Sequence, residues 1–157
     1  MMRFIKVFLY ITVGAIGFAL FTYLIAPKAM IEERVSPYNF DKTVETIVEN
    51  VKQAGWEVPK IYDFQQSLRQ HEQTDVGRIN VIEICYPIYA SQILSTDTGK
   101  SITPMMPCAV GVYEKNDGLT YVASMNVGLM AKLFGDPIAG PMGQVAAEDE
   151  KVMAFLN

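Results

Sequence analysis

The sequence contains few of the residues on which most catalytic and metal sites depend. Its 157 residues include one histidine, His71, and two cysteines, Cys85 and Cys108. It has no C-x-x-C pair, no C-x-x-C-H haem-attachment motif and no serine-histidine or paired-acid arrangement. Gly99-Lys100-Ser101 lacks the upstream glycine of a phosphate-binding loop, which argues against nucleotide binding. These absences favour a binding protein over an enzyme, and two cysteines are too few for a disulfide framework.

Basic residues are also scarce beyond the N-terminus. Two of the 13 lysines and arginines, Arg3 and Lys6, precede Pro27, whereas all 17 acidic residues follow it. The chain after Pro27 therefore carries a formal net charge of −6. Such a surface repels phosphate backbones, so we expect no nucleic-acid partner. It suits a basic partner protein, for example a member of a membrane redox complex.

Charged residues are absent from Val7 to Ala26, a run of twenty positions. As a helix this run is about 30 Å long, enough to cross the hydrocarbon core of a bilayer. Tyr10 and Tyr23 lie near its two ends, where interfacial aromatics are enriched. The sequence predicts a transmembrane anchor over residues 1–27 and a soluble domain over residues 28–157.

A cleaved signal peptide is the alternative interpretation of this N-terminus, because a basic start precedes an apolar run. The run is longer than the apolar region of a usual signal peptide, and Ala26-Pro27-Lys28-Ala29 is a poor cleavage site. Arg3 and Lys6 place the N-terminus in the cytoplasm by the positive-inside rule. We therefore expect a single-pass protein of the cytoplasmic membrane whose domain faces the periplasm or the cell exterior.

The rest of the chain has the periodicities of an α+β domain. The predicted strands are Met30 to Val35, Arg78 to Cys85, Cys108 to Tyr113 and Leu119 to Met125, with a short strand or connector over Trp56 to Ile61. The predicted helices follow Asn39, Asp63, Tyr86, Asn126 and Gly140. Asp117-Gly118 predicts a hairpin turn, and the small polar residues from Ser95 to Thr103 predict an exposed loop.

Both cysteines lie within two residues of a proline, Cys85 at the end of one predicted strand and Cys108 at the start of the next. Cys85 lies two residues before the predicted helix start at Pro87, where the helix dipole is expected to lower its pKa. Cys108 follows Pro107 and begins the next strand. Three interpretations remain open: buried small hydrophobes, a structural disulfide, or a reactive or ligand-binding thiol.

Methionine is unusually frequent. Six of the nine methionines follow residue 100, namely Met105, Met106, Met125, Met130, Met142 and Met153. Thioethers are adaptable core fillers, but they also bind Cu(I) and haem iron. His71 is either a helix-end histidine or a metal ligand together with Cys108 and Met106.

Several of these residues resemble a known family. Cys85-Tyr86-Pro87 with Ala90 and Leu94, then Met106-Pro107-Cys108, Val112-Tyr113-Glu114 and Ala123-Ser124-Met125, are similar to the motifs of the domain of unknown function 302 family. The resemblance covers Met30 to Leu156. It implies a two-layer α+β domain with a curved antiparallel sheet, helices on one side and a topology related to the TATA-binding-protein fold. It also implies a homodimer, and it implies no established activity.

Together these observations predict a membrane-tethered, extracytoplasmic binding or assembly domain. Its ligand would be a small molecule, a redox cofactor or a partner subunit, held near Cys85 and Cys108. The candidate contacts are these two cysteines with Tyr86, Met106, Pro107 and Met125. One alternative is a haem or metal carrier that uses Cys108, Met106 and His71. The other is a thiol redox or sulfur-transfer protein that uses Cys85 and Cys108.

Overall fold

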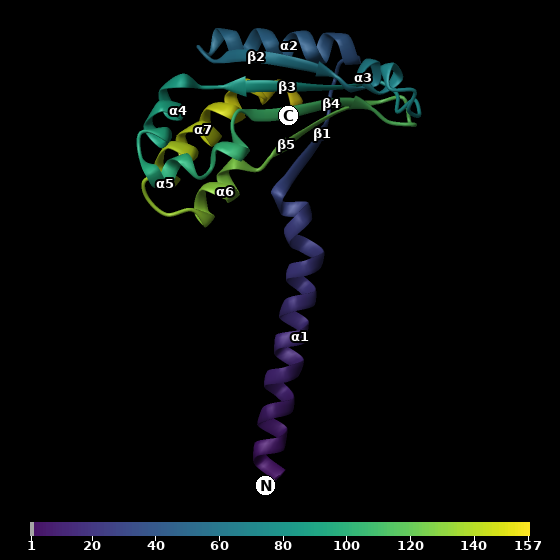
Figure 1. The fold of residues 1–157 in the computed structure, drawn as a ribbon. Helices are drawn as coiled ribbons and strands as arrows, with labels where there is room; N and C mark the ends of the chain where they lie inside the picture. Colours follow the sequence, from purple (N-terminus) through teal and green to yellow (C-terminus); the bar gives the residue numbers. More distant parts are fainter. Residues whose placement is uncertain (1) are drawn as a thin grey trace.

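The computed structural model describes residues 2–157 and consists of one long helix that extends away from an α+β domain (Figure 1). Five strands form a single antiparallel sheet in the order β1-β5-β4-β3-β2. The strands are β1 (Ile31–Val35), β2 (Glu57–Asp63), β3 (Ile79–Cys85), β4 (Cys108–Glu114) and β5 (Thr120–Met125). The α+β class with an antiparallel sheet, predicted from the sequence, is confirmed.

The helices connect these strands and close one end of the domain. The α-helices are α1 (Met2–Met30), α2 (Phe40–Gln53), α3 (Phe64–Gln70), α4 (Pro87–Leu94), α5 (Asp97–Lys100), α6 (Val127–Leu133) and α7 (Ala139–Val152). Two short 3-10 helices are η1 (Thr103–Met105) and η2 (Ala154–Leu156). Figure 1 shows α3 at one end of the sheet and α4 and α5 at the other.

Side chains alternate between the two faces of each strand, and one face is apolar. The side chains of this face on β3, β4 and β5 are almost inaccessible to solvent: Ile82, Ile84, Val110, Val112 and Val122. Ile47 and Val51 of α2 and Val152 at the end of α7 pack against them. The sheet and these two helices therefore form two layers around the main core.

Three of the predicted helix starts are confirmed by side-chain caps. Asn39 Oδ1 accepts a hydrogen bond from the Lys42 N–H at 3.0 Å, and Asp63 Oδ1 accepts one from the Gln66 N–H at 2.8 Å. Asn126 Oδ1 accepts one from the Leu129 N–H at 2.7 Å. Each cap satisfies an N–H that has no partner within its own helix.

Two details of the predicted elements were wrong. Pro27 does not end the first helix, because α1 continues to Met30; so close to the helix end, proline disrupts few of the backbone hydrogen bonds. Residues 95–103 are not a simple exposed loop. They contain α5, and Ile102 and Gly99 are buried there because Ile102 joins a second apolar cluster.

This second cluster lies beyond one end of the sheet. It is built from α4, the segment around Ile102, α6 and α7: Ile93, Ile102, Val127, Met130, Ala131, Ile138 and Met142. Cys108 and Val145 contact both clusters, so the two cores are continuous. Four segments of the chain therefore pack together beyond this end of the sheet.

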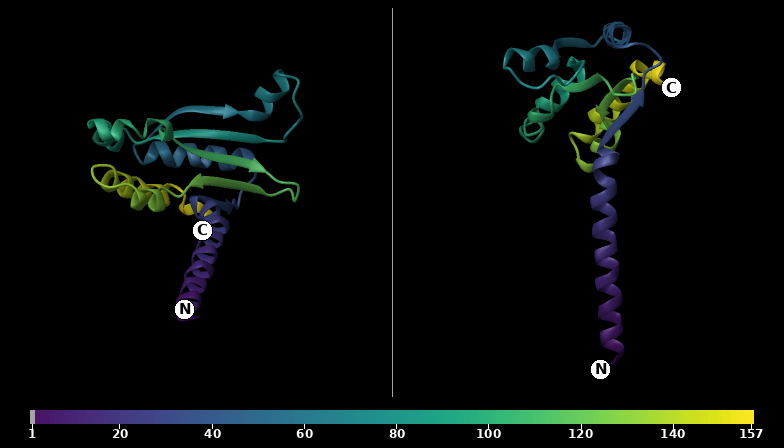
Figure 2. Two further views of the ribbon diagram at one scale, coloured as in Figure 1. Left: turned by 60° about the horizontal axis from the view of Figure 1, so that its bottom comes forward. Right: turned by 90° about the vertical axis from the view of Figure 1, so that its right-hand side faces the viewer.

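Helix α1 joins the domain at this same end. It runs into β1 without a loop, and the Asn126 N–H donates to the Met30 carbonyl at 2.8 Å. Residues Tyr10–Met30 are long and apolar enough to cross a membrane, and the side chains of this span are not buried against the domain. Figure 2 shows α1 projecting away from the domain in two further views.

Candidate functional site

An apolar cavity of about 50 Å³ lies where the sheet end meets the second cluster. Its walls come from β3, the start of α4, η1, the start of β4, the end of β5, α6 and α7. The lining residues are Trp56, Ile84, Cys85, Tyr86, Ala90, Ile93, Ile102, Met105, Met106, Pro107, Cys108, Met125, Val127, Met142 and Val145. None of them carries a charge, so the site favours an apolar occupant.

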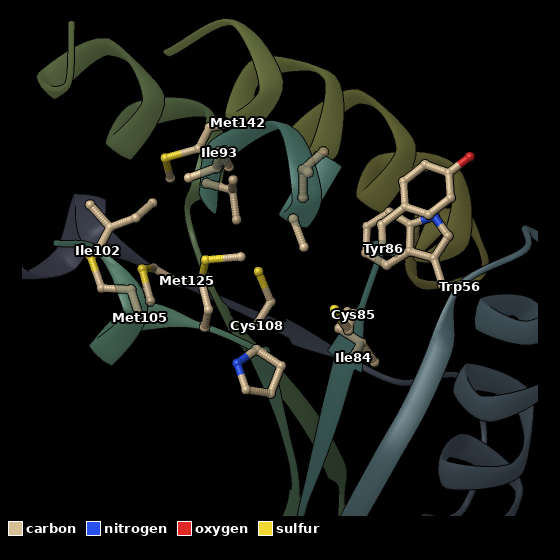
Figure 3. Close-up of a pocket in the computed structure, with 15 residues that line it drawn as sticks. Trp56, Ile84, Cys85, Tyr86, Ile93, Ile102, Met105, Cys108, Met125 and Met142 are labelled. Carbon is tan, nitrogen blue, oxygen red and sulfur yellow. The ribbon is translucent and has the colours of Figure 1, made fainter. Parts of the chain in front are cut away.

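The antiparallel sheet explains why these residues meet. β3 and β4 pair with Ile84 opposite Cys108, so the last residue of β3, Cys85, lies at the same end of the sheet as the first residue of β4. β5 runs back alongside β4 and ends at Met125. Figure 3 shows the Cys108 side chain pointing into the cavity, between Met125 and Cys85.

The structure brings the six predicted ligand-binding residues into this one site. The residues in question are Cys85, Tyr86, Met106, Pro107, Cys108 and Met125, and all of them line the cavity. Of the other methionines, Met105 and Met142 also line it, whereas Met153 is fully buried in the main core. The methionine excess therefore serves both the cavity and the core.

Trp56, Ile93 and Ile102 were not predicted as site residues. Trp56 comes from the segment between α2 and β2, nearly thirty residues before Cys85 in the sequence. In the sequence, Ile93 is an apolar residue of a predicted helix, and Ile102 is an apolar residue within a predicted polar loop. No local pattern assigns them to a cavity, because their placement depends on how α4 and α5 fold over the sheet end.

The predicted lowering of the Cys85 pKa is wrong. Partial burial raises the pKa of this thiol, and the nearby Glu57 carboxylate adds to the effect. Burial raises the pKa of Cys108 to about 11, with smaller contributions from Asp149 and Cys85. Loss of hydration on burial is therefore the largest effect on the pKa of both thiols. Both cysteines are free thiols in this structure, so the disulfide interpretation does not describe it.

The structure does not bring His71 to the cysteines. His71 is an exposed residue at the C-terminal end of α3. Asp63, which caps α3, pairs with Asn80 at the start of β3, whereas Cys108 pairs with Ile84 near its end. Four residues of strand span about 13 Å. Among residues 2–157 no group of three or more histidine, cysteine, aspartate or glutamate side chains is arranged to hold a metal.

One buried polar atom of a cavity-lining residue has no hydrogen-bond partner. The Trp56 side chain is 4% exposed, and its Nε1 is buried without a hydrogen-bond acceptor. The indole ring stacks on the Tyr86 ring with centroids 5.1 Å apart, and Tyr89 packs edge-on against Tyr86 at 4.7 Å. A buried donor without an acceptor costs about 1–3 kcal/mol, so this atom is a marked exception in the packed structure.

Asp149 lies beside the cavity on α7. It lines a smaller hollow that also includes Trp56 and Cys108. Burial raises the Asp149 pKa to about 6; Arg34 opposes this effect, and Glu32 and Glu150 add to it. The pKa of this carboxyl is thus higher in the folded chain than its ordinary value of 3.8.

Replacing this carboxyl should stabilise the protein at neutral pH. Between pH 4 and 6 the folded state binds more protons than the unfolded state, so stability falls as pH rises through that window. Asp149→Asn should raise the free energy of unfolding by up to about 3 kcal/mol at pH 7.5 and leave it unchanged below pH 4. Urea unfolding at both pH values measures this, with Glu72→Gln, at an exposed position outside α7, as the control. Equal stability of Asp149→Asn and wild type at pH 7.5 would contradict it.

No curated protein matches the chain. The crystal structure titled "uncharacterized conserved protein DUF302 from Bacillus stearothermophilus" is similar to it, with a TM-score of 0.71 and 17% sequence identity over 82% of this chain and 98% of that chain. At that identity the likeness shows a shared fold. The family model described as "Domain of unknown function DUF302" matches residues 32–156, the whole domain beyond α1. The chain therefore belongs to the family of the domain of unknown function DUF302.

Proposed function

We propose that the chain is a membrane-tethered binding protein whose domain holds a small apolar ligand in the cavity beside Cys85 and Cys108. The observation that carries this proposal is a cavity in which every lining side chain is uncharged and most are aliphatic or sulfur-containing. Ligand sites are typically concave and mostly apolar, with a few polar groups that fix orientation. Here those groups are the thiols of Cys85 and Cys108.

Methionine side chains make such a cavity adaptable. Met105, Met106, Met125 and Met142 contribute flexible, polarisable thioethers to the walls. Because each has three rotatable side-chain bonds, the cavity can reshape around a ligand with little strain. This property suits a protein that binds one end of an apolar molecule.

The two alternative functions have less support. The raised pKa of both cysteines leaves little thiolate at neutral pH, which disfavours thiol redox or sulfur-transfer chemistry. A carrier that uses His71 would need that residue beside Cys108, and the fold keeps them at opposite ends of β3. Binding of a ligand without a chemical reaction requires neither a thiolate nor His71 at this site.

Filling the cavity should abolish ligand binding. Ala90 lines the cavity from α4, so Ala90→Leu places three extra carbons in it. The probe is 1-bromodecane, whose bromine quenches the fluorescence of Trp56, the single tryptophan of the chain. In lipid nanodiscs, the full-length Ala90→Leu variant should require at least ten times more 1-bromodecane than wild type for the same degree of Trp56 quenching. Ser91→Leu, at the adjacent exposed position, is the control; equal quenching of all three proteins would contradict the proposal.

The proposed tether is α1, with the domain on the extracytoplasmic side. Support comes from the 21-residue apolar stretch Tyr10–Met30, which is not packed against the domain, and from Arg3 and Lys6 before it. Protease added to the outside of spheroplasts should digest the domain and leave a membrane-embedded fragment. Complete protection of the domain until the membrane is lysed would place it in the cytoplasm instead.

We also propose that the domain forms a homodimer through the uncovered face of the sheet. α2 and α7 cover one face, whereas the other presents Ile31 and Val35, which are 52% and 46% exposed, with half-buried Val81 and Ala123 nearby. Pairing of two such faces would remove this apolar surface from water. Light scattering of the detergent-solubilised chain should give the mass of two chains, and Val81→Arg should give one. A wild-type mass of one chain would refute the dimer.

A further inference from the structure

We infer that the cavity is also a binding site for Cu(I), held by the thiolate of Cys108 and the thioethers of Met105 and Met125. This inference goes beyond the proposed function, because it assigns a metal ion to the same cavity and does not depend on an apolar ligand. Three observations carry it: the concentration of sulfur in the walls, the position of Cys108 among these side chains, and the lack of charge around them.

Sulfur is concentrated in the walls of this cavity. The sequence has two cysteines and nine methionines, and both cysteines and four of the methionines line it: Cys85, Met105, Met106, Cys108, Met125 and Met142. These residues come from β3, the segment around η1, β4, β5 and α7, so the fold gathers them from separate parts of the chain. Thiolate and thioether sulfur are the soft ligands that select Cu(I).

Cys108 has the central position among these sulfur-containing side chains. Its side chain points into the cavity in Figure 3, with Met125 next to it and Met105 beyond Met125. All three residues line the same cavity and pack against the second cluster. Cys85 lies on the other side of Cys108 in the same view. One thiol and two thioethers therefore face a common space, and together they supply a trigonal set of sulfur ligands.

Charge balance favours a monovalent ion and a single thiolate. The fifteen described residues that line the cavity include no charged side chain and no histidine, so a net charge there would be costly. Cu(I) bound to one thiolate and two neutral thioethers has a net charge of zero, whereas a second thiolate from Cys85 would leave a negative charge without a counter-ion.

Divalent ions fit this set of ligands less well. Zn²⁺ is bound in proteins by cysteine thiolates, histidine nitrogens and carboxylate oxygens, usually four ligands in all. The described part of the chain brings no three such side chains together in a suitable arrangement. Thioethers add nothing that Zn²⁺ prefers, whereas they are good ligands for Cu(I). The walls therefore discriminate in favour of the softer ion.

Binding exchanges a proton for the metal ion. The S–H bond of Cys108 breaks as the Cu–S bond forms, the proton passes to solvent, and copper stays as Cu(I) with no electron transferred. The two thioethers donate lone pairs and lose no proton. Because each methionine has three rotatable side-chain bonds, its sulfur can close on an ion within a cavity of about 50 Å³ with little strain.

Competition with a Cu(I) chelator tests this inference. The full-length protein is freed of bound compounds by detergent exchange, returned to lipid nanodiscs and given Cu(I) without oxygen, with ferrozine as the competing chelator. We expect wild type to bind one copper ion per chain, and X-ray absorption of the bound copper to show sulfur neighbours only. Cys108→Ser should lower the affinity about a hundredfold, because it removes the anionic ligand. Met125→Leu, which keeps the side-chain volume, should lower it about tenfold.

Met130→Leu is the matched control. Met130 is a buried methionine of the second cluster that does not line the cavity, so this variant should bind Cu(I) with the affinity of wild type. Cys85→Ser should lower the affinity less than Cys108→Ser. Equal affinity of Met125→Leu and wild type, or an equal loss in the two cysteine variants, would overturn the assigned ligands. The methionine comparison and the wild-type spectrum keep the test valid if Cys108→Ser does not fold.

The outcomes separate this inference from the proposed function. If 1-bromodecane quenches Trp56 but wild type takes no copper from ferrozine, the metal site is wrong and binding of an apolar ligand stands. If copper binds with sulfur neighbours but 1-bromodecane does not quench, the proposed apolar ligand is wrong and the metal site stands. Nitrogen or oxygen neighbours in the wild-type spectrum would place the copper outside this cavity and refute the inference.

Discussion

The antiparallel pairing of β3, β4 and β5 is the constraint on which the site depends. It brings the end of β3, the start of β4 and the end of β5 to one edge, so that Cys85, Cys108 and Met125 lie together. The pairing of β1 with β5 then attaches α1 to that same edge through Ile31 and Met125. A single pattern of hydrogen bonds thus fixes both the walls of the cavity and its distance from the predicted membrane span.

Packing at this edge is less complete than in the main core. α2 and the end of α7 cover the centre of the sheet with side chains such as Ile47, Val51 and Val152 that are almost inaccessible to solvent. Beyond the sheet, α4, the segment around Ile102, α6 and α7 form the second cluster, and the cavity lies between this cluster and the strand ends. Two groups near this edge lower the stability of the folded state: the unpartnered Trp56 Nε1 and the half-buried Asp149 carboxyl. Departures from complete polar satisfaction are expected where a protein binds a ligand.

The sequence predicted much of the fold because the relevant signals are local. Alternation of Cys108, Val110 and Val112 identified a buried strand face, and Asn39, Asp63 and Asn126 marked helix starts that the structure confirms. The site was found in part because a proline within two residues of each cysteine marked one end of a strand.

The missed features depend on contacts between distant segments. Trp56 lines the cavity from the segment after α2, and Asp149 lines the neighbouring smaller hollow from the last turn of α7; nothing near either residue in the sequence indicates this. The sign of the Cys85 pKa shift was wrong for the same reason, since burial is decided by tertiary packing and the helix dipole by local sequence. Residues 95–103 looked polar, yet Ile102 folds inward because the second cluster gives it apolar neighbours.

The most direct test of the binding account is a native mass spectrum of the full-length protein, extracted from its own membrane in polymer-bounded nanodiscs without added ligand or reductant. The account predicts folded protein that carries a few hundred daltons of extra mass, which denaturation removes and which is recovered as a neutral, lipid-soluble compound. Folded protein with only the mass of its chains, under conditions that retain bound lipid on other membrane proteins of the same extract, would contradict it.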